Sequence, residues 1–181
     1  MKTILIFFGS LIVSLLIIVS ISVTLTKKQC TIIENKEVMI DYTNYTLAIE
    51  HIKASEGLRL KTYELDDNYY IGYGHKVNKS HPPIIKQQAD SMIMSIFNQK
   101  LFYVSNKYNV TGNQALSLAM LFYAVKPSSI RCSVLNNELL SSIKDSTSIV
   151  NSWTSFCIFQ NKVHPKIKKR REFEVNLFFT K

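Results

Sequence analysis

Cysteine is scarce in this chain, and the pattern that a metal site requires is missing. Only Cys30, Cys132 and Cys157 occur, without a Cys-x-x-Cys pair or a cluster of histidine and cysteine. A structural zinc site needs such a cluster, so we expect neither a metal nor another cofactor. Cys132 and Cys157 can pair in an oxidising compartment or remain as two buried free thiols, and the sequence leaves both alternatives open.

Acidic residues are also outnumbered. The chain has 13 Asp and Glu against 22 Lys and Arg, which gives a formal net charge of +9. Such an excess favours anionic partners, such as nucleic acid, anionic lipid or the polymers of a bacterial envelope. The basic run from Lys166 to Arg171 is a candidate nucleic-acid patch. We favour a solvated helix face that carries one or two functional arginines, and we expect no nucleic-acid partner.

No charged residue occurs between Thr3 and Thr26, where Ile, Leu, Val and Phe dominate. A helix of about 20 apolar residues crosses the hydrocarbon core of a bilayer. A cleaved signal peptide would have a shorter apolar core and a small-x-small cleavage site, for which Ser20-Ile21-Ser22 is a faint candidate. Residues 1–28 are therefore predicted to be a transmembrane anchor or uncleaved signal, with a cleaved signal peptide as the alternative.

Residues 29–42 are polar enough to predict a linker, and residues 43–181 are predicted to form one domain. Helical spacing of apolar residues begins this domain, and Gly57 can end the first helix after Glu56. A small hairpin or meander with a turn at Asp67-Asn68 should follow. Later helices are predicted from about Ile85, over Gln114–Tyr123 as a buried central helix, and over Val134–Ile143, Ser148–Phe156 and Lys166–Phe178. The expected fold class is α+β, mostly helical with a small N-terminal hairpin or sheet.

Glu56 is the first candidate for chemistry. A carboxyl group at a helix end, against a tyrosine-rich segment, can be partly desolvated and can then donate a proton near neutral pH. An arbitrary glutamate would more often form a surface ion pair, here with Arg59 or Lys53. The sequence around Glu56 favours the catalytic interpretation, for the reason given next.

Two segments carry a specific resemblance, and three others support it. The segments Glu56-Gly57-Leu58-Arg59-Leu60-Lys61-Thr62-Tyr63 and Ile71-Gly72-Tyr73-Gly74-His75 resemble the active-site signature of phage-type lysozymes (glycoside hydrolase family 24) almost residue for residue. Weaker similarity is found at Gln87-Gln88-Ala89-Asp90, at Asn113-Gln114-Ala115-Leu116, and from Trp153 to Arg170-Arg171, Glu174 and Leu177-Phe178. The final segment is most similar to lysozyme-like proteins of Bacteroidetes mobile elements.

The resemblance implies a lysozyme-like fold and a peptidoglycan hydrolase. Such a muramidase cleaves the β-1,4 bond between N-acetylmuramic acid and N-acetylglucosamine, and the matching residue Glu56 would be its general acid. Peptidoglycan would be the partner of a monomeric domain. A domain that degrades the wall must lie outside the cytoplasm, so we expect inner-membrane anchoring with the domain on the periplasmic or extracytoplasmic side.

The chain departs from the family pattern where the attacking water is handled. The family has an Asp nine residues after the acid and a Thr before the Ile-Gly pair, whereas Leu65 and Tyr70 stand at these places here. Asp66 or Glu64 is the candidate second carboxylate, and Asp66 ranks first because it lies nearer the turn. A pair that leaves room for water implies inversion, and a closer pair implies retention. The alternative is a catalytically impaired lysozyme-like protein that binds peptidoglycan.

The aromatic and glycine residues of the signature are candidates for substrate binding. Tyr63 and Tyr70 can line a saccharide cleft, since sugars bind against aromatic faces, although at strand spacing they can equally be core and surface pairs. Gly72 and Gly74 permit close backbone approach to a sugar or a tight bend.

Three further residues are candidates because of the resemblance. His75 is implied to be a structural hydrogen-bonding residue rather than a base. Arg170 or Arg171 is implied to reach Glu56 or to hold the substrate. A basic helix terminus without a functional role is the plain alternative for both arginines.

Overall fold

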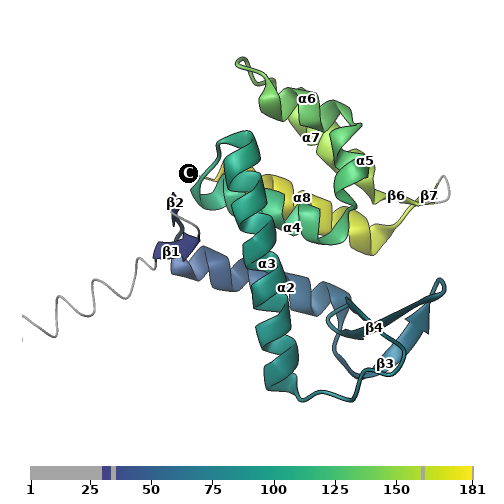
Figure 1. The fold of residues 1–181 in the computed structure, drawn as a ribbon. Helices are drawn as coiled ribbons and strands as arrows, with labels where there is room; N and C mark the ends of the chain where they lie inside the picture. The colour runs from purple at the N-terminus through teal and green to yellow at the C-terminus, as the bar shows by residue number, and fades with distance from the viewer. Residues whose placement is uncertain (1–29, 34–35, 160–161, 181) are drawn as a thin grey trace, which may run out of the picture.

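The computed structural model describes residues 30–33, 36–159 and 162–180 (Figure 1). Within the range predicted as a linker, strands β1 (Cys30–Ile33) and β2 (Lys36–Met39) form an antiparallel pair. The predicted membrane anchor, residues 1–28, lies outside the described residues. Among the residues that are described, no helix is both long and apolar enough to span a bilayer.

Helix α2 (Tyr42–Glu56) begins at the last residue of the range predicted as a linker and ends at Glu56, as the sequence predicted. The Asp41 carboxylate accepts hydrogen bonds from the backbone N–H groups of Thr43 (2.7 Å) and Asn44 (3.2 Å), which caps the N-terminus. Gly57 ends the helix at φ 74°, a conformation that favours glycine, and its N–H donates to the Lys53 carbonyl. Glu56 is therefore the last residue of the helix.

A three-stranded antiparallel sheet follows, with the order β3-β4-β5. Its strands are β3 (Arg59–Leu65), β4 (Asn68–Gly72) and β5 (His75–Val77). The turn between β3 and β4 consists of Asp66 and Asp67, both at positive φ, rather than the predicted Asp67-Asn68. Two left-handed residues match the right-handed twist of a tight hairpin, and aspartate tolerates this conformation better than most residues.

The rest of the domain is mostly helical. Its elements are α3 (Lys86–Tyr108), α4 (Gly112–Ala124), α5 (Pro127–Arg131), α6 (Val134–Leu140), α7 (Ser146–Thr154), η1 (Ser155–Cys157), β6 (Ile158–Phe159), β7 (Lys162–Val163) and α8 (Pro165–Phe179). In Figure 1 the sheet lies beyond the C-terminal end of α2, and α5, α6 and α7 lie on the far side of α4 and α8. The predicted α+β class is confirmed.

Helix α4 is the centre of the core. All its residues from Ala115 to Phe122 are buried, as expected for a helix that is apolar on every side. Helices α2, α3 and α8 pack around it. Helix α8 is also held against α2 by stacking of the His51 and Phe173 rings, whose centroids are 4.0 Å apart. This packing brings α8 to the C-terminal end of α2, where Glu56 lies.

Helix α6 is shorter than the sequence predicted. Helix α6 ends at Leu140 rather than near Ile143, which is 84% exposed. The Ser141 hydroxyl donates to the Ile143 carbonyl and accepts from the Ile143 N–H, and such local hydrogen bonds compete with continuation of the helix.

Cys132 is exposed and Cys157 is buried, and both are free thiols rather than a disulfide.

Asp90 on α3 ties α2 and the sheet to that helix. Its carboxylate contacts Lys86 Nζ (2.6 Å) and Lys53 Nζ (3.1 Å), and it accepts from the Tyr73 hydroxyl (3.0 Å). The hydrogen bond from Lys86, aided by Lys53 and Tyr73, lowers the pKa of Asp90 from 3.8 to about 2. The Asp90 carboxylate therefore stabilises the fold at pH values above its ordinary pKa.

This lowered pKa predicts an acid-dependent contribution to stability. The contribution should be complete above about pH 4 and should disappear as the pH falls through about 2, where Asp90 is protonated in the folded protein too. In urea unfolding between pH 6 and pH 2, Asp90→Asn should be less stable than wild type at the upper end, and the difference should shrink towards zero. A difference that stays constant with pH would contradict this assignment.

Candidate active site

The candidate site is built around Glu56, where α2 meets the sheet. Its side chain is 29% exposed, so the carboxyl group is reachable from solvent but partly enclosed. Arg170 Nη1 on α8 donates to Glu56 Oε1 over 2.6 Å. Arg170 is only 9% exposed, so this ion pair is held by a nearly buried guanidinium. Of the two arginines considered from the sequence, Arg170 is the one that reaches Glu56.

Glu174, on the same helix, forms ion pairs with both arginines. Its fully buried carboxylate contacts Arg170 Nε (3.3 Å) and Arg171 Nη2 (3.0 Å), and it accepts from Trp153 Nε1 (3.0 Å). Burial raises the pKa of Glu174, and the two guanidiniums act against that shift. Burial likewise lowers the pKa of Arg171. Arg171 thus forms an ion pair with Glu174, whereas Arg170 forms ion pairs with both Glu174 and Glu56.

The Gly-Tyr-Gly-His segment passes close to the free oxygen of Glu56. A Cβ atom at Gly74 would lie 3.7 Å from Glu56 Oε2, and the residue has φ 83°, so glycine suits the position for space and for conformation. The Tyr123 hydroxyl of α4 donates to the Tyr73 carbonyl over 2.9 Å, which fixes this segment to the core. Burial raises the pKa of Tyr123, and the negative charge of Glu56 adds to the shift.

Tyr63 and Tyr70 form a cross-strand pair in the hairpin. Their ring centroids are 5.8 Å apart, and the Arg59 guanidinium lies 4.2 Å from the Tyr63 centroid. Burial raises the pKa of Tyr63, and the charge of Glu56 raises it further, against the lowering effect of Arg59. The structure therefore confirms that Tyr63 and Tyr70 are neighbours across the hairpin.

The two candidates for a second carboxylate lie in the β3-β4 hairpin. Glu64 is exposed and pairs with Tyr69, so strand alternation places its side chain on the face opposite Tyr63. Asp66 lies in the turn at the tip of the hairpin, at the end of β3 that is remote from α2 (Figure 1). The role of Asp66 or Glu64 as the second carboxylate stays a prediction.

The other two candidates from the sequence have surroundings that indicate packing. Gly72 has φ 65°, and a Cβ atom there would lie 3.4 Å from the Ala89 Cβ, so it allows β4 to approach α3 closely. His75 is half-buried in β5 opposite Ile71. Burial lowers the pKa of His75, and the nearby His81 adds to this shift.

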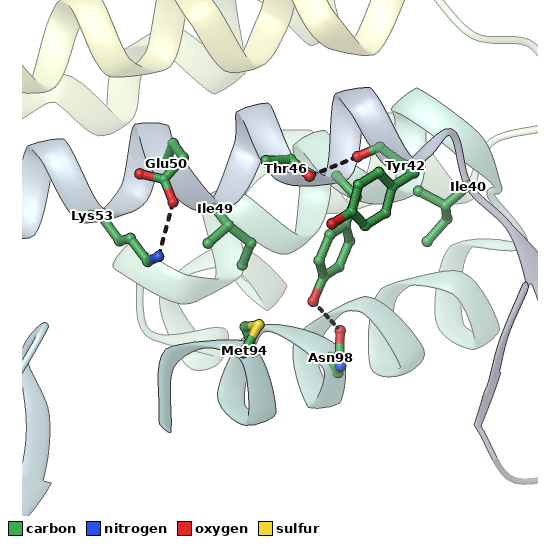
Figure 2. A pocket seen from close by; sticks show the side chains of 9 residues that line it. Ile40, Tyr42, Thr46, Ile49, Glu50, Lys53, Met94 and Asn98 are labelled. Carbon is green, nitrogen blue, oxygen red and sulfur yellow. Dashed lines mark hydrogen bonds and ion pairs between the residues drawn. The ribbon is translucent and has the colours of Figure 1, made fainter. Parts of the chain in front are cut away.

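A pocket of about 340 Å³ opens beside Glu56, between the end of α4 and the start of α8. It is lined by Ser55, Glu56, Ala124, Val125, Phe156, His164, Lys166, Ile167, Arg170 and Arg171. Another pocket, of about 420 Å³, lies between α2 and α3 (Figure 2). In that one, Tyr45 donates to Asn98 and Lys53 pairs with Glu50, so its polar groups already bind one another. We therefore place the candidate site at the pocket beside Glu56.

Sequence reasoning gave no role to Tyr123 or to the buried Glu174. A signal for Glu174 was present, because it lies four residues after Arg170 and next to the apolar residues Val175, Leu177 and Phe178. A glutamate on such a helix face is rarely buried unless it is paired with a cation. For Tyr123, the sequence only indicated an apolar central helix. Among the described residues, no cluster of His, Cys, Asp and Glu could hold a metal ion.

No protein-family model matches the sequence, and no curated protein is significantly similar to it. Solved structures do match. The muramidase domain of SpmX from Asticaccaulis excentricus aligns with a TM-score of 0.64 at 22% identity, over 75% of this chain and 96% of that one. The endolysin from Escherichia coli O157:H7 phage FAHEc1 aligns with a TM-score of 0.58 at 19% identity, over 73% and 90%. The P1 phage endolysin Lyz gives 0.57 at 16% identity, over 72% and 82%.

The chain therefore has the lysozyme-like fold of muramidases and phage endolysins. This confirms, at the level of the fold, the resemblance to phage-type lysozymes that the motifs predicted.

Proposed function

We propose that this protein is a peptidoglycan hydrolase of the muramidase type, with Glu56 as its general acid. The bond cleaved would be the β-1,4 linkage between N-acetylmuramic acid and N-acetylglucosamine. The observation that carries the proposal is the position of Glu56 at the helix end, paired with Arg170 over 2.6 Å beside an open pocket. The lysozyme-like fold supports the same substrate class.

The geometry assigns different tasks to the two oxygens of Glu56. Oε1 is held by Arg170, which fixes the orientation of the carboxyl group. Oε2 lies toward Gly74, where the absence of a side chain leaves room for a sugar oxygen. A proton on Oε2 can pass to the glycosidic oxygen as the bond breaks. Negative charge then develops on Glu56, and the adjacent guanidinium stabilises it.

A second candidate function is supported by the position of the other carboxylates. Hydrolysis with inversion needs a base on the far side of the sugar, at roughly 6.5–9.5 Å from the acid, and retention needs a closer carboxylate. Glu64 points to the opposite face of the hairpin and Asp66 lies at its tip. This observation favours a lysozyme-like protein that binds peptidoglycan and has impaired catalysis.

Product analysis distinguishes the two functions. The full-length protein is incubated with purified insoluble peptidoglycan, new reducing ends are reduced with borohydride, and the products are hydrolysed and identified. A muramidase yields the reduced form of muramic acid. Co-sedimentation with peptidoglycan and no new reducing ends would support the binding function instead. Loss of both binding and cleavage would contradict both candidates.

We also propose that the apolar segment up to residue 28 anchors the domain in the inner membrane, with the domain on the extracytoplasmic side. The absence of charge between Thr3 and Thr26 supports the anchor, and the net charge of +9 suits an anionic envelope. Fractionation and protease treatment of spheroplasts test this placement. Release of the protein by alkaline carbonate, or its protection from added protease, would contradict it.

A further inference from the structure

Two glycines flank Tyr73, and both have backbone conformations that other residues rarely adopt. Gly72 has φ 65° and Gly74 has φ 83°. Glycine populates positive and negative φ about equally, so the chain on either side of Tyr73 has little conformational preference of its own. An added Cβ at Gly74 would lie 3.7 Å from Glu56 Oε2. The position of Gly74 beside the acid therefore depends on the contacts that hold Tyr73.

Tyr73 is held at two points. Its hydroxyl donates to the Asp90 carboxylate over 3.0 Å, and its carbonyl accepts from the Tyr123 hydroxyl over 2.9 Å. The first hydrogen bond fixes the side chain against α3, whereas the second acts on the backbone. The carbonyl belongs to the planar peptide group that joins Tyr73 to Gly74. The Tyr123 hydroxyl therefore sets the orientation of the peptide group that leads into Gly74.

Tyr123 is well placed to hold that peptide group. It lies in the last turn of α4, the helix at the centre of the core, and directly before Ala124, which lines the pocket beside Glu56. Burial raises the pKa of Tyr123, and the charge of Glu56 raises it further, against the lowering effect of Arg170. The hydroxyl therefore keeps its proton at neutral pH and can donate it to the Tyr73 carbonyl.

We propose that Tyr123 is a positioning residue for the acid, because its hydrogen bond to the Tyr73 carbonyl keeps Gly74 at the distance from Glu56 Oε2 that a sugar oxygen requires. The inference rests on the proposed function, in which a proton passes from Oε2 to the glycosidic oxygen. If Gly74 moved toward Oε2, it would fill the space for that oxygen. If it moved away, the sugar would lose the wall that holds it beside the acid. Reacting atoms must lie about 3–3.5 Å apart, so a small displacement in either direction lowers the rate.

Tyr123→Phe tests the proposal in the full-length protein, because it removes the hydroxyl and keeps the ring. The matched control is Tyr45→Phe. Both tyrosines are half-buried, and the Tyr45 hydroxyl also donates a hydrogen bond of 2.9 Å, to Asn98. Tyr45 lies on α2 roughly three helical turns before Glu56. Three quantities are measured: kcat and KM on soluble glycan strands, the free energy of unfolding in urea, and hydrogen–deuterium exchange of the backbone amides of residues 72–75.

Tyr123→Phe should lower kcat by about 10- to 100-fold and change KM by less than about twofold, since a misplacement of about 1 Å can cost about 10²-fold in rate. The amides of residues 72–75 should exchange faster than in wild type. Tyr45→Phe should lose a similar amount of stability while kcat and the exchange of these amides stay at wild-type values. This contrast separates positioning from a general loss of stability, which both variants share.

Three results would overturn the proposal. They are an unchanged kcat in Tyr123→Phe, an equal fall of kcat in Tyr45→Phe, and a higher KM at unchanged kcat, which would make Tyr123 a substrate-binding residue instead. A wild-type protein that cleaves nothing contradicts the proposed hydrolase. In that case the exchange data alone decide whether Tyr123 holds the segment, and unchanged exchange in Tyr123→Phe would show that it does not.

Discussion

Replacing Glu56 with Gln is expected to reduce peptidoglycan cleavage by about 10²- to 10⁴-fold, the usual contribution of general acid–base catalysis. The amide cannot donate a proton of carboxylic acidity to the glycosidic oxygen. It retains the shape of the side chain and an oxygen that can accept from Arg170, so the fold and the pocket should persist. Zymography on peptidoglycan gels, together with release of reducing ends, measures the effect, and circular dichroism confirms that the variant is folded.

Glu64→Gln and Asp66→Asn are the matched controls, because each removes one carboxylate at nearly constant volume. Glu64 is exposed on β3 and Asp66 lies in the turn at the tip of the hairpin, so each variant should keep its activity to within about twofold to threefold of wild type. A loss at either position as large as that of Glu56→Gln would mean that the hairpin rearranges to supply the second carboxylate. Equal activity of Glu56→Gln and wild type would rule out Glu56 as the acid.

Replacing Glu174 with Ala is expected to lower the free energy of unfolding by about 3–5 kcal/mol, the effect of removing one partner from a buried ion pair. Glu174 is fully buried and binds Arg170, Arg171 and the Trp153 indole. Without it, two guanidiniums remain in the core, and only Glu56 compensates them. Urea unfolding followed by circular dichroism measures the change. Glu174→Gln keeps some of the hydrogen bonds and should lose less.

Glu172→Ala provides the control on the same helix. Glu172 is about half exposed, and its contact with Lys168 is long, at 3.8 Å. An exposed pair of this kind contributes roughly 0–1 kcal/mol, so the unfolding midpoint should hardly move. If the two alanine variants unfolded at the same urea concentration, the buried network would not have the structural importance assigned to it.

Local sequence was sufficient for the helix that carries the acid. Asp41 supplies side-chain acceptors for free backbone N–H groups, and Gly57 ends the helix at a positive φ that favours glycine. The apolar stretch within α4 likewise predicted a central buried helix, because such a segment has no polar face for water. These features depend on contacts within a few residues or on composition, which the sequence displays directly.

Predictions were less accurate where several local solutions have similar free energies. The turn lies at Asp66 and Asp67, one residue before the predicted position, because the pairing of Leu65 with Asn68 leaves those two residues between the strands. Helix α6 stops before Ile143 because the Ser141 side chain offers the backbone other hydrogen bonds. Apolar spacing alone does not show this competition.

The sequence by itself determined that a carboxylate stands at a helix end, next to a glycine-rich segment and within a lysozyme-like pattern. Only the tertiary structure decided what surrounds that carboxylate. Arg170 and Arg171 are chemically identical neighbours, and the rotation of α8 against α2 and α4 turns the first toward Glu56 and the second toward Glu174 alone. The pairing of β3 with β4 likewise places Glu64 at an exposed position of the strand and Asp66 in the turn. Both outcomes depend on how distant segments pack, which no local pattern encodes.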